Sequence, residues 1–141
     1  MADINERNIN QEQEIDKTIY GYVINDIIFF DARRGCLWNI DAKNLGSNFI
    51  KRVVLRKTTN RLLIFLLFNC VSNLTPMNVN TLMFNVWDKY DLQSSNQRLW
   101  QAVKFLNFKI MELGGPRELF FRSGGDLFIN NYANIKLLQV N

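Results

Sequence analysis

The sequence predicts an α+β fold, with an N-terminal antiparallel β-sheet followed by three helices and a C-terminal β-hairpin. β-branched and aromatic residues crowd residues 20–55, whereas apolar residues at helical spacing dominate residues 58–113. Two β-like runs flank Gly124-Gly125 near the C-terminus. The 141 residues suit one domain, and an apolar fraction of 48% is enough to form a buried core.

The first strands are expected between residues 20 and 55. Tyr20–Asp31 and Cys36–Ile40 are rich in strand-forming residues, and the turn residues 32–35 between them predict an antiparallel hairpin. Asp41–Asn48 contains turn residues around Leu45, and Phe49–Leu55 is a further strand candidate. These runs predict a small N-terminal sheet.

Two helices are expected next. Thr58 or Thr59 is a candidate N-cap for a helix that runs to about Asn69 and is almost continuously apolar, so we expect it to be mostly buried. Thr75 is the predicted N-cap of the second helix, with Pro76 at its first position. The second helix carries apolar residues at spacings of three and four, namely Val79, Leu82, Met83, Val86 and Trp87.

The third helix has the clearest pattern and is predicted over Asn96–Glu112. Ser94 and Gln97 form a capping-box pattern at its start, and Gly114-Gly115-Pro116 ends it. One side is apolar through Leu99, Ala102, Val103, Leu106, Ile110 and Leu113. The opposite side presents Gln97, Gln101, Lys104 and Phe108, with Trp100 and Phe105 at its margins and Arg98 and Lys109 on one flank.

The polar side of this helix is suited to DNA. Glutamine can bond adenine through two hydrogen bonds in the major groove, and lysine can reach guanine or a phosphate. We therefore predict DNA contacts from Gln97, Arg98, Gln101, Lys104 and Phe108. The alternative is an ordinary solvated helix face.

Two neighbouring segments are candidates for further DNA contacts. Leu119–Ser123 and Leu127–Asn130 predict a hairpin whose tip, at Arg122, Ser123, Gly124 and Gly125, would lie against a minor groove. The alternative there is an ordinary tight turn. Arg56, Lys57, Thr58 and Arg61 start the first helix, where they would contact the DNA backbone or remain solvated surface groups.

Composition limits the other function classes. Residues 1–17 carry five acidic residues against two basic ones, a charge of −3, so with a total of +4 the remaining chain carries +7. We predict a flexible acidic tail over residues 1–17, with a short amphipathic helix as the alternative, and a folded domain over residues 18–131. Residues 132–141 are predicted to be a further strand or a linker. A basic body is compatible with a polyanionic partner.

Enzymatic chemistry is not expected, and neither is a cofactor or metal. The sequence has no histidine, which removes histidine nucleophile pairs and histidine metal ligands. Cys36 and Cys70 lack zinc-site spacing and are expected to be buried thiols, with a disulfide as the alternative. Asp88 and Asp91 have no nucleophile or phosphate-binding loop to act with, so we expect a solvated loop.

Membrane insertion and secretion are not indicated either. No apolar run reaches the ~18 residues that a membrane span needs, and the longest, Leu62–Phe68, is short enough to belong to a core helix. The acidic and amide residues at the N-terminus do not resemble a signal peptide.

Four motifs together resemble the OmpR-type winged helix: Leu62–Leu67, Val86-Trp87, the spacing of Leu99, Val103, Leu106 and Ile110, and Gly124–Ile129. No receiver domain precedes these motifs in the sequence, which makes it similar to the ToxR and CadC branch, in which the DNA-binding domain comes first. The resemblance implies a winged helix-turn-helix fold and a bacterial transcription regulator, in the first instance an activator, that binds double-stranded DNA. It implies a place in the bacterial cytoplasm, or at the inner membrane if the native chain continues past Asn141 into a membrane helix.

The sequence departs from this family in the third helix. The family carries several arginines or lysines around Phe105, Asn107 and Phe108, where this chain has aromatic or neutral residues. Burial is the first expectation for Phe105 and Trp100, while Phe108 is left open between burial, thymine methyls and a protein contact. The alternative function is a protein-interaction module on the same scaffold, which binds DNA only with a second protomer, RNA polymerase or a partner regulator.

Overall fold

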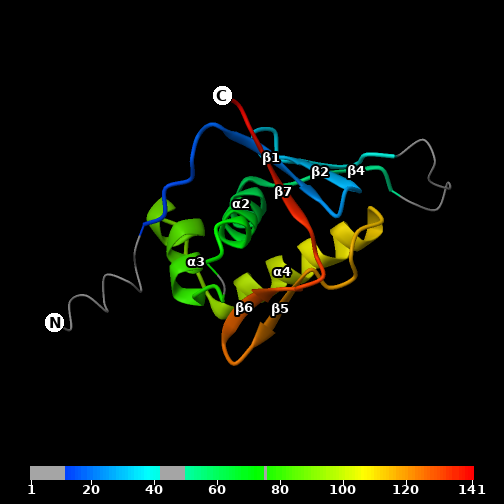
Figure 1. The fold of residues 1–141 in the computed structure, drawn as a ribbon. Helices are drawn as coiled ribbons and strands as arrows, with labels where there is room; N and C mark the ends of the chain where they lie inside the picture. The colour runs from blue at the N-terminus through cyan, green and yellow to red at the C-terminus, as the bar shows by residue number, and fades with distance from the viewer. Residues whose placement is uncertain (1–11, 42–49, 75) are drawn as a thin grey trace.

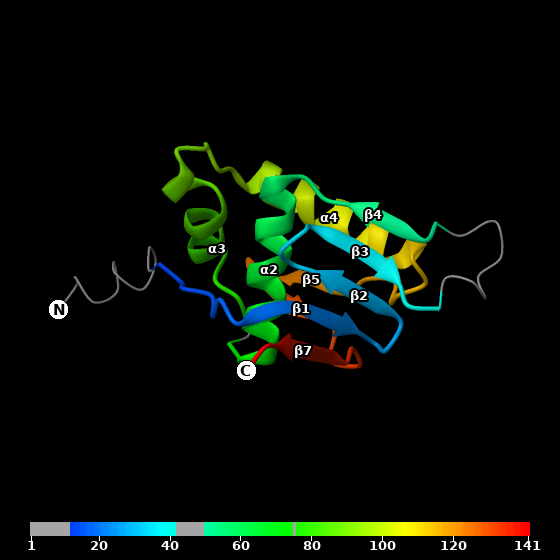
Figure 2. The same cartoon turned by 90° about the horizontal axis from the view of Figure 1, so that it is seen from above.

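The structure is a computed structural model that describes residues 12–41, 50–74 and 76–141. Within these residues it is an α+β fold with three α-helices, a five-stranded antiparallel sheet and a separate two-stranded hairpin. The sheet lies above helix α4 (Asn96–Glu112) in Figure 1, and the hairpin lies on the other side of that helix. Figure 2 shows α2 (Lys57–Val71) between the sheet and α3 (Val79–Val86).

The N-terminal strands form successive hairpins. β1 (Ile19–Ile24) pairs with β2 (Ile28–Asp31), which pairs with β3 (Cys36–Asn39), which pairs with β4 (Arg52–Val54). The predicted run Tyr20–Asp31 is thus not one strand, because Asn25 and Asp26 adopt positive φ angles of 52° and 56° and turn the chain. The turn predicted over residues 32–35 is confirmed. The predicted turn around Leu45 and the residue Phe49 lie outside the described residues.

The C-terminal residues complete this sheet. β7 (Ile135–Gln139) pairs antiparallel with β1, with Ile24 opposite Ile135 and Tyr22 opposite Leu137. Residues 132–141 therefore contain a strand, and the folded unit extends beyond the predicted boundary at residue 131. The five strands lie in the order β4-β3-β2-β1-β7, side by side in Figure 2.

Helix α2 spans Lys57–Val71, so the predicted cap at Thr58 or Thr59 is wrong and both threonines lie inside the helix. Its N-cap is Arg56, without a side-chain hydrogen bond. Helix α3 spans Val79–Val86 and is capped by Asn78, whose Oδ1 accepts from the Thr81 N–H at 3.0 Å.

The predicted start of α3 at Thr75 and Pro76 is too early. The Met77 N–H donates to the Leu127 carbonyl at 2.8 Å, and the Leu127 N–H donates to the Met77 carbonyl at 3.2 Å. This two-bond bridge keeps Met77 in extended backbone, so the helix cannot begin before it. The partner lies 50 residues further along the sequence, beyond the reach of local patterns.

Helix α4 has the predicted bounds, Asn96–Glu112, and follows a short 3₁₀ helix, η2 (Asp88–Tyr90). Its N-cap is Ser95, not the predicted Ser94: the Ser95 Oγ accepts from the Arg98 N–H at 3.1 Å. The hairpin strands are β5 (Phe120–Ser123) and β6 (Asp126–Ile129), with Ser123 opposite Asp126. The two turn glycines adopt φ angles of 60° and 89°, which glycine accepts without steric cost.

One apolar core joins these layers. It is built around helix α2, six of whose 15 residues are fully buried, and it receives side chains from the inner face of the sheet, from α3, from α4 and from the hairpin. Of the predicted tail, residues 12–17 are described, and Ile15 packs against this core. The described part of the chain contains no helix that is both long and apolar enough to cross a membrane.

Candidate nucleic-acid interface

The outer side of α4 is a ridge of polar and aromatic residues. Leu99, Val103, Leu106 and Ile110 bury the inner side, and their spacing determines which residues face solvent. The exposed residues at complementary spacings lie above one another along the helix. We call these five residues the α4 ridge: Gln97, Gln101, Lys104, Phe105 and Phe108.

Both phenylalanines of the ridge are exposed. Phe105 is 43% exposed and Phe108 is 52% exposed, so the expected burial of Phe105 is wrong. Phe105 follows Lys104 on the outer side of the helix. Trp100, at the margin, is half-buried as expected. Large exposed aromatic side chains that gather on one helix face are typical of a contact surface.

The cations near the ridge differ in how firmly they are held. Lys104 is exposed and has no hydrogen-bond or ion-pair partner among the described residues. Arg98 is exposed, but its Nη1 donates to the Gln93 carbonyl at 2.6 Å and so braces the loop before the helix. Lys109 pairs with Glu112 at 3.1 Å. Lys104 is therefore the cation that is most available to a partner of the ridge.

One side chain of α4 makes two hydrogen bonds to the hairpin. Asn107 Nδ2 donates to the Phe120 carbonyl at 2.8 Å, and Asn107 Oδ1 accepts from the Phe120 N–H at 3.0 Å. On the other side of the hairpin, the bridge between Met77 and Leu127 joins it to the segment before α3. The hairpin is thus fixed to α4 and to the segment before α3. The sequence patterns predicted no role for Asn107, whose only signal is that it is a polar residue beside the apolar stripe of α4.

Arg122 links the hairpin to the margin of the ridge. Its guanidinium carbon lies 5.1 Å from the centroid of the Trp100 ring, a cation–π contact. Ser123, Gly124 and Gly125 follow it and are exposed, and a Cβ at either glycine would meet no atom within 4 Å. The structure therefore brings Arg122 close to α4 and leaves the space around Gly124 and Gly125 open.

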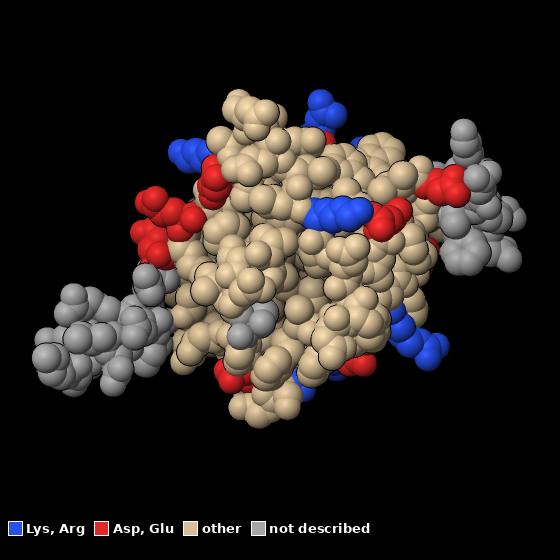
Figure 3. All heavy atoms as spheres, viewed as in Figure 1, with Lys and Arg blue, Asp and Glu red and all other residues tan. Residues whose placement is uncertain are grey.

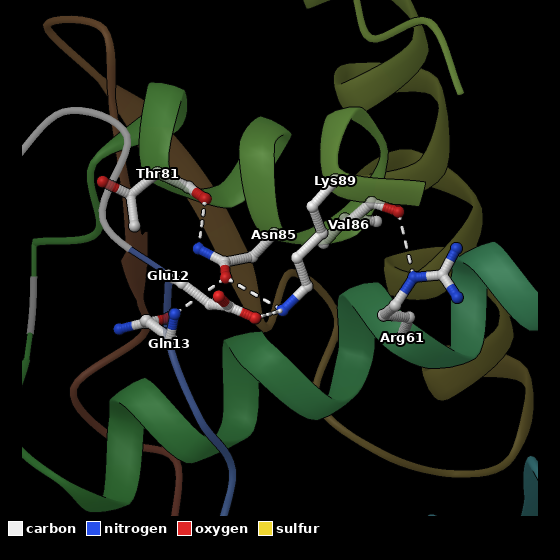
Figure 4. Close-up of polar contacts among 7 residues, drawn as sticks. All are labelled: Glu12, Gln13, Arg61, Thr81, Asn85, Val86 and Lys89. Carbon is white, nitrogen blue, oxygen red and sulfur yellow. Dashed lines mark hydrogen bonds and ion pairs between the residues drawn. The ribbon is translucent and has the colours of Figure 1, made fainter. Parts of the chain in front are cut away.

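The predicted backbone contacts at the start of α2 lie elsewhere. Arg56 and Lys57 are exposed and Thr58 is half-buried. Arg61 Nε donates to the Val86 carbonyl at 2.9 Å (Figure 4), and its guanidinium stacks at 3.7 Å over the Tyr90 ring. Lys57 and Arg61 line a groove with residues 12–17 rather than joining the α4 ridge.

Uncharged side chains predominate on the face shown in Figure 3, and acidic residues gather at its edge beside the N-terminal segment. A polyanion would meet few cations there, so this face is a poor candidate for DNA.

Among the described residues no group of three or more acidic or cysteine side chains could hold a metal ion. Cys36 and Cys70 are free thiols, and burial raises the pKa of Cys70 to about 12.

A buried amide network, which the sequence patterns did not indicate, connects the N-terminal segment to α2 and α3. The Gln13 N–H donates to Asn85 Oδ1 at 2.8 Å, and the Gln13 and Asn69 side-chain amides bond each other in both directions at 3.0 and 3.2 Å. Lys89 extends the network to Asn85 and to Glu12, as Figure 4 shows. Asn69 and Asn85 are 4% and 0% exposed, so Gln13 satisfies polar groups that water hardly reaches.

No protein-family model matches this sequence, and comparison with curated protein sequences gives no significant match.

Proposed function

We propose that the chain is a winged-helix regulator of bacterial transcription that binds double-stranded DNA. In this proposal α3 and α4 form the helix-turn-helix, α4 is the recognition helix, and β5 and β6 form the wing. The α4 ridge enters the major groove, and the turn at Arg122–Gly125 lies on the neighbouring backbone or minor groove. The resemblance to OmpR-type regulators favours an activator.

One observation carries this proposal: an exposed helix face with glutamines and a lysine lies beside a hairpin that is fixed to the same helix. Gln101 and Lys104 are one turn apart and point outward together. Asn107 and the contact of Arg122 with Trp100 hold the hairpin at a set position relative to them. A rigid pair of elements of this kind can contact base edges and the backbone at once.

Titration of a labelled duplex from the region upstream of the chain's own gene tests the proposal. Fluorescence anisotropy at several salt concentrations should show saturable binding, with an affinity that falls by about one log unit per log unit of salt for each phosphate contact. The variant Gln101→Ala/Lys104→Ala should lose roughly tenfold or more in affinity for its specific site.

A matched control is the variant Lys136→Ala. Lys136 is exposed on β7, and its ion pair with Asp26 at 2.6 Å lies between two exposed side chains, so it contributes little to stability. This variant should bind as the unchanged protein does. Equal affinity of all three proteins would show that the α4 ridge is not the DNA surface, and absence of binding at low salt would refute DNA binding itself.

The exposure of Phe105 and Phe108 favours a second candidate function, a module that docks another protein through α4. Aromatic residues are enriched at the centres of protein interfaces. Salt separates the two candidates, because an aromatic protein contact responds little to ionic strength while a phosphate contact responds steeply. The variant Phe105→Ala/Phe108→Ala should abolish a protein contact, whereas it should leave the salt slope of DNA binding unchanged, because neither phenylalanine contacts a phosphate.

A further inference from the structure

Strand β7 forms one edge of the five-stranded sheet, and its outer side is open to a further strand. It is the last strand in the order β4-β3-β2-β1-β7, and Figure 2 shows it at the border of the sheet. It contains no proline, and the irregularity in its pairing with β1 lies between Ile19 and Gly21 of β1. A regular edge strand of this kind offers its free N–H and carbonyl groups to another chain.

Alternate backbone groups of β7 point away from the sheet. Just before the strand, the Asn25 N–H donates to the Asn134 carbonyl at 2.7 Å. Just after it, the Val140 N–H donates to the Thr18 carbonyl at 2.9 Å. Because residues that bond to the neighbouring strand alternate with residues that do not, the even-numbered residues of β7 bond to β1. The N–H and carbonyl groups at positions 135, 137 and 139 therefore face the open edge.

The core side of β7 carries apolar surface that the helices do not fully cover. Leu137 lies opposite Tyr22, which is 0% exposed, and so faces the core side of the sheet. Ile135 faces the same side two residues earlier. Leu137 is nevertheless 38% exposed, and a hollow of about 350 Å³ lies between Ile135 and the end of α2. A strand added at this edge would cover apolar surface as well as form hydrogen bonds.

The opposite edge of the sheet is protected against such pairing. β4 has three residues, and two exposed cations, Lys51 and Arg52, lie just before it and at its first position. Charged side chains at an edge hinder the approach of a second strand. β7 has one charged residue, Lys136, whose Nζ is bound to Asp26 Oδ1 at 2.6 Å. β7 is therefore the better edge for a further strand.

We propose that β7 pairs antiparallel with β7 of a second copy of this chain, across a twofold axis at Leu137. This register joins the outward groups in three pairs, 135 with 139, 137 with 137 and 139 with 135, and each pair has two hydrogen bonds. It sets Lys136 opposite Leu138 of the second copy, so that like charges do not face each other. An axis at Lys136 would place the two lysines directly opposite, which is unfavourable.

A second copy is the occupant because the strand is complementary to itself in this register. The contact goes beyond DNA binding and does not depend on it, since neither the α4 ridge nor the turn at Arg122–Gly125 belongs to β7. We expect one strand pair to bury less than the ~1,200 Å² at the low end of stable interfaces. The dimer should therefore be weak, with a Kd of roughly 10 µM to 1 mM.

Sedimentation velocity over a range of protein concentrations tests the proposal. The sedimentation coefficient should rise towards that of a dimer as the concentration approaches about 1 mM. Leu137→Lys should weaken the dimer tenfold or more, because two ammonium groups then meet at the axis. The control Val54→Lys adds the same charge to a 63% exposed residue of the other edge strand and should dimerise as the unchanged protein does.

Opposite charges at the axis separate loss of pairing from loss of folding. An equimolar mixture of Leu137→Lys and Leu137→Glu should restore the dimer, while circular dichroism should show that each variant is folded. A sedimentation coefficient of the unchanged protein that does not vary with concentration would overturn the proposal. So would a dimer that Leu137→Lys leaves intact, or folded variants whose mixture stays monomeric.

Disulfide formation tests the register. In the background Cys36→Ala/Cys70→Ala, the variants Lys136→Cys and Leu138→Cys are mixed and oxidised with copper phenanthroline, and mass spectrometry counts the mixed dimer. The Cα atoms of these two positions should lie about 4.5 Å apart across the pair, within the range of a disulfide. Lys136→Cys alone should crosslink several-fold less, because its two copies lie on a diagonal. Equal yields from the mixture and from Lys136→Cys alone would contradict the register.

Discussion

Asn107 and Phe120 are joined by two hydrogen bonds in opposite directions, from Nδ2 to the Phe120 carbonyl at 2.8 Å and from the Phe120 N–H to Oδ1 at 3.0 Å. An amide side chain here takes the place of a neighbouring strand, because it offers β5 one donor and one acceptor. The first residue of the hairpin is thereby fixed to the middle of α4. The position of the hairpin tip relative to the α4 ridge depends on this pair.

Replacement of Asn107 by alanine should detach the start of the hairpin. Two hydrogen bonds are lost and two backbone groups of a 1% exposed residue lose their partner, so we expect unfolding to become easier by about 2 kcal/mol. Urea denaturation measures this change, and amide hydrogen exchange at Phe120 should accelerate. Asn96→Ala, at an exposed position of the same helix, is the control and should change stability by less than about 0.5 kcal/mol.

The bounds of α4 were predictable because every local pattern agrees there. Its apolar stripe and the Gly114-Gly115-Pro116 stop point to the same helix, and only the capping serine was assigned one residue too early. The start of α3 was not predictable. Thr75-Pro76 is a good local helix start, but the bridge between Met77 and Leu127 overrides it. Long-range backbone pairing of this kind leaves no periodic trace near either residue.

The candidate site was predictable in the same limited way. Gln101 and Lys104 were expected outward, and they are exposed, because helical periodicity determines their direction once the apolar side is known. Periodicity does not determine whether a neighbouring element covers a flanking residue, which is why Phe105 was misjudged. Nothing in the sequence around Arg61 indicates its hydrogen bond to the Val86 carbonyl or its contact with the Tyr90 ring.

Gln13 should matter more for stability than its neighbours in the N-terminal segment. Gln13→Ala removes the amide pair with Asn69, which is 4% exposed, and we expect a loss of about 1 to 2 kcal/mol. Glu14→Ala is the matched control, because Glu14 is exposed and has no hydrogen bond among the described residues. Thermal melts of both variants measure the difference. Equal melting temperatures would mean that water replaces Gln13 at no cost.

Cys70 should be unreactive in the folded protein. Burial raises its pKa from an ordinary value of 9.0 to about 12, so the thiolate that reacts with alkylating agents is scarce at neutral pH. In the variant Cys36→Ala, iodoacetamide should modify Cys70 at least roughly tenfold more slowly in the native state than in urea. A native rate equal to the unfolded rate would contradict the burial of this thiol.

The raised pKa of Cys70 also makes the stability of the folded protein depend on pH. Because the unfolded thiol loses its proton first, the stabilisation is fully present below pH 9.0 and is lost as the pH rises towards about 12. In the variant Cys70→Ala this contribution should be absent. Denaturant unfolding of both proteins across that window measures the free energy of unfolding of the unchanged protein minus that of the variant, and this difference has to fall as the pH rises if the assignment is correct.

Arg122 should position the hairpin through Trp100 and contact DNA at the same time. The guanidinium lies 5.1 Å from the ring centroid, and such contacts contribute about 0.5 to 1 kcal/mol at exposed sites. Arg122→Ala should therefore change Trp100 fluorescence and reduce DNA affinity. Arg117→Ala, which removes the same charge from an exposed residue before the hairpin, should leave the fluorescence unchanged.

The conservative variant separates the two roles of Arg122. Arg122→Lys keeps the charge but replaces the planar group that stacks on the ring, so it should retain most of the salt dependence of DNA binding while the fluorescence changes as in Arg122→Ala. If Arg122→Lys instead lowers the salt slope as much as Arg122→Ala does, the charge alone cannot be what DNA recognises. Arg122 would then contact the DNA backbone only while it stacks on Trp100. Positioning of the hairpin and contact with DNA would in that case be a single role.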